Sequence, residues 1–196
     1  QLLQEDKQPV TLVDFDLVEP FYTLRPIKEE LEKQGLQVIA WETKYTMGFG
    51  EAGTLIKPEM RWALRRPGHV IFDVGYGVEG AKKLWLVEGA LTGGELKIYA
   101  VINIARPVTG DVERIIDYAQ SLDQVDALIN NSHLGDDTDI AIIQEGARIV
   151  SEAAKQMGMP VMWTAADRKF REQLGEKDVM GNPVKYLTRY MNRAFW

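Results

Sequence analysis

Six apolar runs alternate with longer amphipathic stretches along the chain, and this alternation constrains the fold more than any other feature of the sequence. The runs lie at residues 10–15, 36–41, 69–74, 96–104, 125–130 and 160–164. They are rich in Val and Ile and mostly apolar on both faces, as expected of parallel strands that are covered on two sides. The pattern predicts a doubly wound α/β fold, with a mostly parallel sheet and helices on both faces.

The stretches between the runs carry helix start and stop signals. Pro26 stands at a first helical position, Gly35 ends the same segment, and Gly158 ends the longest one. The predicted helical segments are residues 26–35, 57–66, 110–123 and 139–158. The 196 residues contain no repeat and no low-complexity linker. We therefore expect a single nucleotide-binding α/β domain over residues 1–196.

Composition limits the partners and the metal sites. A net charge of −6 disfavours contact of the whole surface with nucleic acid or anionic lipid, so such contact would need a local basic patch. The absence of cysteine excludes disulfides, thiolate zinc sites and a cysteine nucleophile. No apolar run approaches the roughly 20 residues of a membrane helix. We expect a cytoplasmic protein with no membrane span and no nucleic-acid partner.

Polar side chains follow several of the predicted strands. Asp14 and Asp16 end the first strand, Asp73 ends the third, and Asn130 and Asn131 end the fifth. Ligands of open α/β sheets bind outside the carboxyl ends of the strands. Magnesium takes one or two carboxylates together with water and substrate phosphates. These strand ends therefore predict a site for magnesium and a phosphorylated ligand.

The stretch VIFDVGYGVEG at residues 70–80 fits two motifs. Its glycines, Gly75, Gly77 and Gly80, match the G-x-G-x-x-G fingerprint of a Rossmann dinucleotide-binding unit. Its apolar strand ending in Asp73 matches instead the acidic strand of a nucleoside triphosphatase. The next predicted strand has no acid at its tip to hold a ribose, which disfavours the Rossmann interpretation. In the triphosphatase interpretation the three glycines form a flexible loop after the strand.

Three segments in order resemble the MinD/ParA/CobQ class of P-loop ATPases, which includes the nitrogenase iron protein. The first is VTLVDFDLVEPFY, an apolar strand ending in D-x-D; the second is Asp73-Val74-Gly75-Tyr76; the third is NNSHLG at residues 130–135. The resemblance covers nearly the whole chain and is closest to an ATP-binding subgroup of unassigned role. It implies a nucleotide switch that binds ATP with magnesium and hydrolyses it as a homodimer, acting on an unknown protein partner.

The resemblance also implies roles for single residues. Asp16 matches the switch aspartate that orients the attacking water and contributes to the magnesium site. Asp73 matches the Walker B aspartate, which binds magnesium through water. Asn131 matches the asparagine that recognises adenine, and Asn130 and Asp14 are further candidate nucleotide-binding residues. For Asp14 the alternative is a buried acid that holds a loop.

The sequence departs from the class in three places. Tyr76 stands where the subgroup tends to have a second glycine, and Glu19 replaces a usual Asn before Pro20. The larger departure is that no G-x-x-x-x-G-K-[ST] phosphate-binding loop is present. In the class this loop precedes the first of the three segments, so we expect it upstream of Gln1 in the intact protein.

The sequence leaves two other functions open. The first is a catalytically inactive interaction scaffold that keeps a P-loop-like fold without binding nucleotide. The second, which the glycine pattern keeps open, is a Rossmann oxidoreductase that binds NAD.

Overall fold

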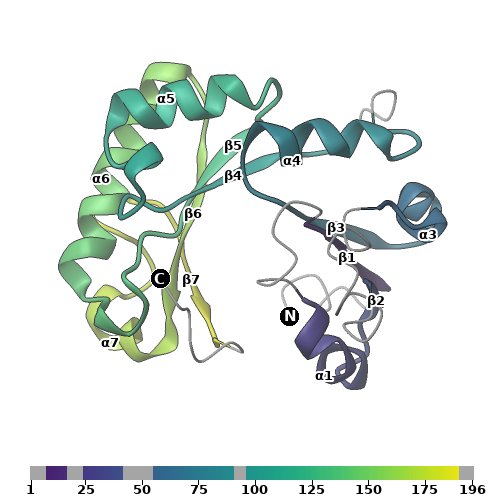
Figure 1. The fold of residues 1–196 in the computed structure, drawn as a ribbon. Coiled ribbons are helices and arrows are strands. Elements are labelled where there is room, and N and C mark those ends of the chain that lie inside the picture. Colours follow the sequence, from purple (N-terminus) through teal and green to yellow (C-terminus); the bar gives the residue numbers. More distant parts are fainter. Residues whose placement is uncertain (1–7, 17–23, 42–54, 91–95, 190–196) are drawn as a thin grey trace. The chain divides into compact units, whose positions relative to one another are not determined.

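The structure of the chain is a computed structural model that describes residues 8–16, 24–41, 55–90 and 96–189. The chain divides into two compact units, Gln1–Leu96 and Lys97–Trp196. Each unit has its own parallel sheet, drawn in Figure 1. The class predicted from the alternating runs, α/β with parallel strands, is confirmed. The single domain expected over residues 1–196 stays a prediction.

The first unit contains a three-stranded sheet with the order β2-β1-β3. Its strands are β1 (Val10–Phe15), β2 (Gln37–Ile39) and β3 (His69–Val74), and both pairings are parallel. Helix α1 (Lys28–Lys33) covers part of one face, where its Leu31 packs with Val38 and Ala40. Two other helices, α3 (Pro58–Arg61) and α4 (Gly77–Lys83), precede and follow β3. β3 is an edge strand among the described residues.

The second unit contains a four-stranded sheet with the order β4-β5-β6-β7. Its strands are β4 (Tyr99–Ile102), β5 (Ala127–Asn130), β6 (Val161–Asp167) and β7 (Val184–Leu187), all paired in parallel. Helices α5 (Val112–Ser121) and α6 (Ile140–Met157) pack on one face of this sheet through Ile115 and Val150. Short helix α7 (Arg171–Leu174) packs beside them through Leu174.

Local chemistry sets the ends of the two long helices. The carboxylate of Asp111 accepts a hydrogen bond from the backbone of Arg114 at 2.9 Å, and Asp139 does the same for Ile142. Such N-caps satisfy amides that have no partner inside the helix. α6 ends at Gly158, whose φ of +70° is typical of a left-handed C-cap. The helices expected at residues 110–123 and 139–158 are therefore confirmed.

The structure corrects one local prediction and adds one strand. The flexible loop expected around Gly75, Gly77 and Gly80 is wrong, because α4 begins at Gly77 and contains Gly80. The added strand is β7, whose sequence VKYL is too short and too polar to stand out as an apolar run. No helix in the described parts of the chain is long and apolar enough to cross a membrane.

Candidate functional site

Two aspartates face the same side of the first sheet at the carboxyl ends of neighbouring strands. Asp14 of β1 and Asp73 of β3 are register partners, so their side chains leave adjacent strands on one face. Asp16 follows directly after β1. Asp14 is fully buried, Asp16 is half-buried, and Asp73 is exposed on the edge strand. The structure thus brings together the three acids that the sequence predicted at this edge.

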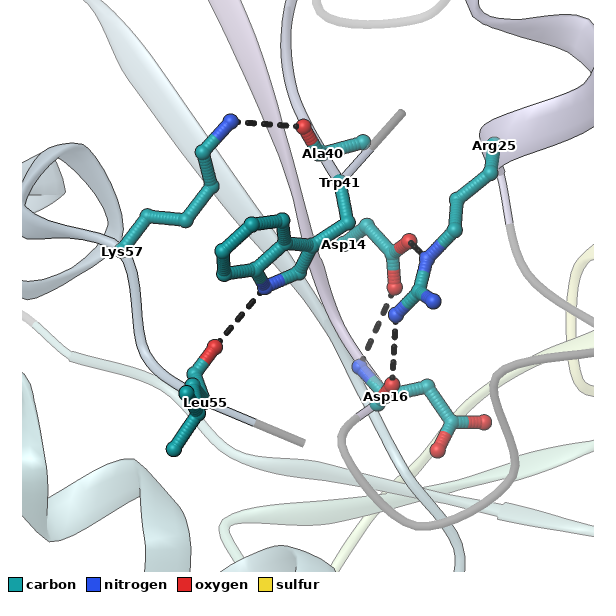
Figure 2. A network of polar contacts seen from close by, with 7 residues as sticks. All are labelled: Asp14, Asp16, Arg25, Ala40, Trp41, Leu55 and Lys57. Atoms are coloured by element: carbon teal, nitrogen blue, oxygen red, sulfur yellow. Dashed lines mark hydrogen bonds and ion pairs between the residues drawn. The ribbon is translucent and has the colours of Figure 1, made fainter. Parts of the chain in front are cut away.

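Asp14 forms a buried ion pair with Arg25. The Nε of Arg25 donates to Oδ2 of Asp14 at 2.7 Å, and the two side chains are 2% and 0% exposed. The Nη2 of Arg25 also donates to the backbone carbonyl of Asp16 at 3.2 Å, as Figure 2 shows. The other Asp14 oxygen accepts from the backbone amide of Asp16 at 3.2 Å. These bonds favour the alternative in which Asp14 is a buried acid that holds a loop. Its contact with nucleotide stays a prediction.

Asp16 lies against the turn that follows Asp73. A Cβ atom added to Gly75 would come within 2.4 Å of Oδ1 of Asp16. A Cβ added to Gly80 would come within 1.8 Å of the carbonyl oxygen of Gly75. Only glycine fits at these two positions without displacing a neighbour, so helix α4 packs tightly on the turn. In Figure 2 the carboxylate of Asp16 is directed away from that of Asp14.

The electrostatics of this edge are concentrated on Asp73. Burial, and then the charges of Asp14 and Asp16, raise the pKa of Asp73 from 3.8 to about 6. Asp73 nonetheless has an exposed surface, so water reaches its carboxylate and weakens the interactions that raise its pKa. The contribution of charge to this upward shift agrees with the geometry, since Asp14 is the register partner of Asp73 on the neighbouring strand. The folded chain therefore binds a proton at Asp73 more readily than the unfolded chain does.

This shift predicts a pH dependence of stability. Because the pKa of Asp73 is higher in the folded chain than in the unfolded chain, protonation of Asp73 stabilises the fold. This stabilisation is complete below pH 3.8 and is lost as the pH rises through about 6. The Asp73→Asn variant has no proton to lose. We expect its melting temperature to rise relative to the wild type between about pH 4 and about pH 7.5.

The measurement is thermal unfolding of both proteins across that pH range. Glu79→Gln is the matched control, because it also removes one carboxylate from the first unit, on the exposed surface of α4 where Glu79 pairs with Lys82. The raised pKa of Asp73 is contradicted if the difference in melting temperature between Asp73→Asn and the wild type stays constant with pH. It is also contradicted if Glu79→Gln shows the same increase with pH.

The donor set at this edge suits magnesium better than zinc. No group of three or more His, Cys, Asp or Glu side chains that could hold a metal occurs in the described part of the chain. Magnesium does not need such a group, because it keeps several waters and takes only one or two carboxylates. Asp16 and Asp73 could supply these carboxylates, while the carboxylate of Asp14 is already ion-paired with Arg25. A divalent cation would also offset the charges of Asp14 and Asp16, which, after burial, raise the pKa of Asp73.

In the second unit, Asn130 at the end of β5 is part of a buried polar network. Its Nδ2 donates to the carbonyl of Ile143 at 3.2 Å and to Oγ1 of Thr164 at 3.1 Å. Its Oδ1 accepts from the backbone and the hydroxyl of Ser132. Thr164 in turn donates to Oδ2 of Asp178 at 2.6 Å. The amide of Asn130 is thus fully used inside the fold, and its predicted role toward nucleotide stays a prediction.

Asn131 has a different environment from its neighbour. It is half-buried, and its backbone amide donates to the carbonyl of Ile102 at 2.8 Å. No hydrogen bond of its side chain is recorded with any described residue. Next to it, Asn103 exchanges two hydrogen bonds with the backbone of His133, at 3.1 and 3.2 Å. Asn131 is therefore the strand-end amide of β5 that the fold leaves available, at a position braced by Asn103.

His133 completes this edge of the second sheet. Burial, and then the charges of Arg189 and Arg106, lower the pKa of His133. Its Nδ1 accepts a hydrogen bond from the backbone amide of Gly135 at 3.2 Å, which requires that nitrogen to be unprotonated. A hollow of about 400 Å³ lies at the carboxyl ends of β6 and β7 and is lined by Asp136, Asp167, Arg168, Lys169, Leu187, Thr188 and Arg189. This edge thus combines an available amide, a neutral histidine and a charged hollow.

Some residues that shape these two edges had no clear signal in the sequence. Arg25 looks like an ordinary surface arginine before Pro26, and only its place beneath Asp14 shows that it is buried. Asp178 stands in DVMGNP, a pattern typical of turns, and its carboxylate accepts from the backbone amides of Met180 and Asn182. The turn could therefore have been found from the sequence, but the contact of Asp178 with Thr164 could not.

Comparison with known proteins adds no relative to these observations. No protein-family model matches the sequence, and neither a curated protein nor a solved structure is significantly similar to it.

Proposed function

We propose that the protein is a magnesium-dependent ATPase of the MinD/ParA/CobQ class that uses ATP as a switch. The observation that carries the proposal is the meeting of Asp16, Asp73 and the Gly75 turn at the carboxyl ends of β1 and β3. Two acidic strand ends side by side suit a hydrated divalent cation and a polyphosphate, because that cation offsets the charge of both. Gly75 lets the Asp16 carboxylate approach the backbone closely.

The proposal assigns a role to each candidate residue. Asp16 orients the attacking water and belongs to the magnesium site, and Asp73 holds magnesium through water. Asn131 reads the edge of the adenine base. Magnesium, when bound, supplies charge neutralisation for the phosphates. Asp14 supports Asp16 by accepting its backbone amide, and Asn130 supports the segment of Asn131 by accepting hydrogen bonds from Ser132, the next residue.

The topology of the first sheet leaves a place for the strand that precedes the phosphate-binding loop in that class. In the class, the strand that precedes the phosphate-binding loop lies beside the Walker B strand. Among the described residues β3, which carries Asp73, pairs only with β1, so its outer side can accept another parallel strand. A homodimer, an as yet unknown protein partner and a cytoplasmic location belong to the same proposal.

One observation favours a second candidate, a nucleotide-free interaction scaffold. The sequence contains no G-x-x-x-x-G-K-[ST], and without that loop the β- and γ-phosphates lack their usual cradle. Contacts within the chain, the Asp14–Arg25 pair and the Asn130 network, fix polar side chains at both edges. The two candidates differ in one measurable property, which is binding of Mg-ATP.

The test is calorimetric titration of the protein with Mg-ATP, Mg-GTP and NAD. We expect Mg-ATP to bind and to be hydrolysed slowly. Asp16→Ala should keep binding Mg-ATP while hydrolysis falls by about a hundredfold or more, because the water loses its orienting group. The companion variant Asn131→Ala should instead weaken ATP binding by roughly tenfold through loss of hydrogen bonds to the base.

Asp117→Ala is the control for both variants, since it removes an exposed acid of α5 that contacts neither edge. Unchanged turnover in Asp16→Ala contradicts the switch role, and unchanged affinity in Asn131→Ala contradicts the base-reading role. Binding of none of the three nucleotides supports the scaffold. Binding of NAD alone, weakened by Gly77→Ala, supports an oxidoreductase instead.

A further inference from the structure

A basic and aromatic surface lies on the segment that leads into β3. Residues 55–68 contain Lys57, Arg61, Arg65 and Arg66 against the single acid Glu59, in a chain whose net charge is −6. Helix α3 and the 3₁₀ turn Ala63–Arg65 bury Met60 and Ala63 completely. The opposite side of the segment exposes Arg61, Trp62, Arg65 and Arg66, which we call the arginine–tryptophan surface.

Trp62 organises the arginines of this surface. The guanidinium of Arg65 lies over the indole with its Cζ 4.0 Å from the ring centroid, and that of Arg61 lies 5.6 Å away. Stacking of this kind holds a guanidinium in place and leaves the N–H groups at its edge directed outward. No ion pair of Arg61 or Arg65 is recorded with a described acid. Both cations are therefore positioned and available for an external anion.

The segment is fixed to the body of the first unit rather than loosely attached. The Nζ of Lys57 donates to the carbonyl of Ala40 at 3.1 Å, and the indole of Trp41 donates to the carbonyl of Leu55 at 2.8 Å (Figure 2). Arg66 donates to the side chain of Gln37 at 2.9 Å, and the carbonyl of Arg61 accepts from the backbone of Glu88. A preformed surface loses less conformational entropy when a partner binds.

We propose that the arginine–tryptophan surface binds a segment of a partner protein that is rich in Asp and Glu. Carboxylates match the paired N–H groups of a stacked guanidinium, and Arg and Trp are the residue types most enriched at interface hot spots. A nucleic-acid base fits less well, because the ring of Trp62 is already covered by Arg65 and Arg61. A lipid surface fits less well, because the helical elements are too short to insert an apolar face.

This surface is separate from the candidate nucleotide site. Arg66 lies three residues before β3 begins at His69, whereas Asp73 is the residue before Val74, where the strand ends. The six residues of β3 span about 20 Å at the usual rise per residue. A partner at the arginine–tryptophan surface and a nucleotide beyond the carboxyl end of the strands can therefore bind at the same time. The inference does not depend on the proposed ATPase activity.

The test is fluorescence anisotropy of a labelled peptide of alternating Asp and Glu residues, titrated with the full chain. We expect binding that weakens as salt is raised from about 50 to about 200 mM. Arg65→Glu should weaken binding by about tenfold or more, because it places a like charge opposite the peptide. Arg65→Lys should cause a smaller loss, since it keeps the charge but not the stacked fork. Trp62→Ala should weaken binding as well.

Lys33→Glu is the matched control, because it changes the net charge by the same amount at an exposed position of α1 in the same unit. Circular dichroism and thermal unfolding establish that each variant is folded. Absence of peptide binding, or an equal loss in Lys33→Glu, overturns the proposal. So does a stronger, Arg65-dependent interaction with phosphatidylserine vesicles or with single-stranded DNA, which would assign the surface to lipid or to nucleic acid.

Discussion

Replacing Asp14 by Ala should lower the free energy of unfolding of the first unit by about 3–5 kcal/mol, because the guanidinium of Arg25 is left buried without its partner. The pair is almost sealed from water, with side-chain exposures of 2% for Arg25 and 0% for Asp14. The Asp14 carboxylate also accepts the backbone amide of Asp16, which loses its acceptor in the same variant. Urea unfolding measures the loss, and hydrogen exchange over β1 assigns it to this unit.

A double-mutant cycle separates the ion pair from simple loss of packing. Arg25→Met alone should also destabilise, because it leaves a buried carboxylate whose charge is no longer paired. Asp14→Leu alone should destabilise for the same reason as Asp14→Ala, and Asp14→Leu combined with Arg25→Met should recover much of the loss, since an apolar pair needs no charge compensation. Strictly additive effects of the two substitutions would contradict a coupled buried pair.

Replacing Asp178 by Ala should lower the stability of the second unit by about 3 kcal/mol or more, because several buried donors lose one acceptor. Asp178 is 6% exposed and accepts hydrogen bonds from Thr164, Met180 and Asn182. Asp178→Asn should lie between the wild type and Asp178→Ala, because one oxygen still accepts the two backbone amides. Urea unfolding followed by circular dichroism provides the comparison.

Asp136→Ala is the control for Asp178→Ala. Asp136 also makes a contact of 2.6 Å, to Arg189, but its side chain is 80% exposed. A surface ion pair of this kind contributes about 0–1 kcal/mol, so the control should change stability little. Both aspartates thus make a contact of 2.6 Å, but Asp178 is buried and accepts bonds from three residues, whereas Asp136 is exposed and pairs with Arg189. An equal loss of unfolding free energy in Asp178→Ala and Asp136→Ala would contradict the larger effect expected for the buried hydrogen bonds of Asp178.

Much of the secondary structure could be predicted because it follows from local patterns. The strands expected at residues 10–15 and 69–74 have the bounds of β1 and β3. The strand expected at residues 96–104 is longer than β4, which covers only Tyr99–Ile102. β7 was missed because VKYL has neither the length nor the apolar content of the other runs. Short edge strands depend on pairing with a neighbour, and that pairing has no local signal.

The candidate site was only partly predictable. Aspartates and asparagines at strand ends could be placed from the alternation alone, because parallel strands bring their carboxyl ends to one edge. The alternation of strands does not predict which of these residues are buried in contacts within the fold and which are not. Asp14 and Asp16 are two positions apart, yet one forms a buried ion pair and the other lies against Gly75. Likewise Asn130 is enclosed in a network while the side chain of Asn131 has no recorded bond to a described residue.

The sequence by itself determined the α/β class, the parallel strands and the kind of residue at each strand end, because these depend on periodicity and local order. Only the tertiary structure decided which of those polar groups are used within the fold. Burial, charge pairing and close backbone approach arise between segments far apart in the chain, as with Asp14 and Arg25 or Thr164 and Asp178. The same holds for the raised pKa of Asp73, which needs the register of β1 against β3.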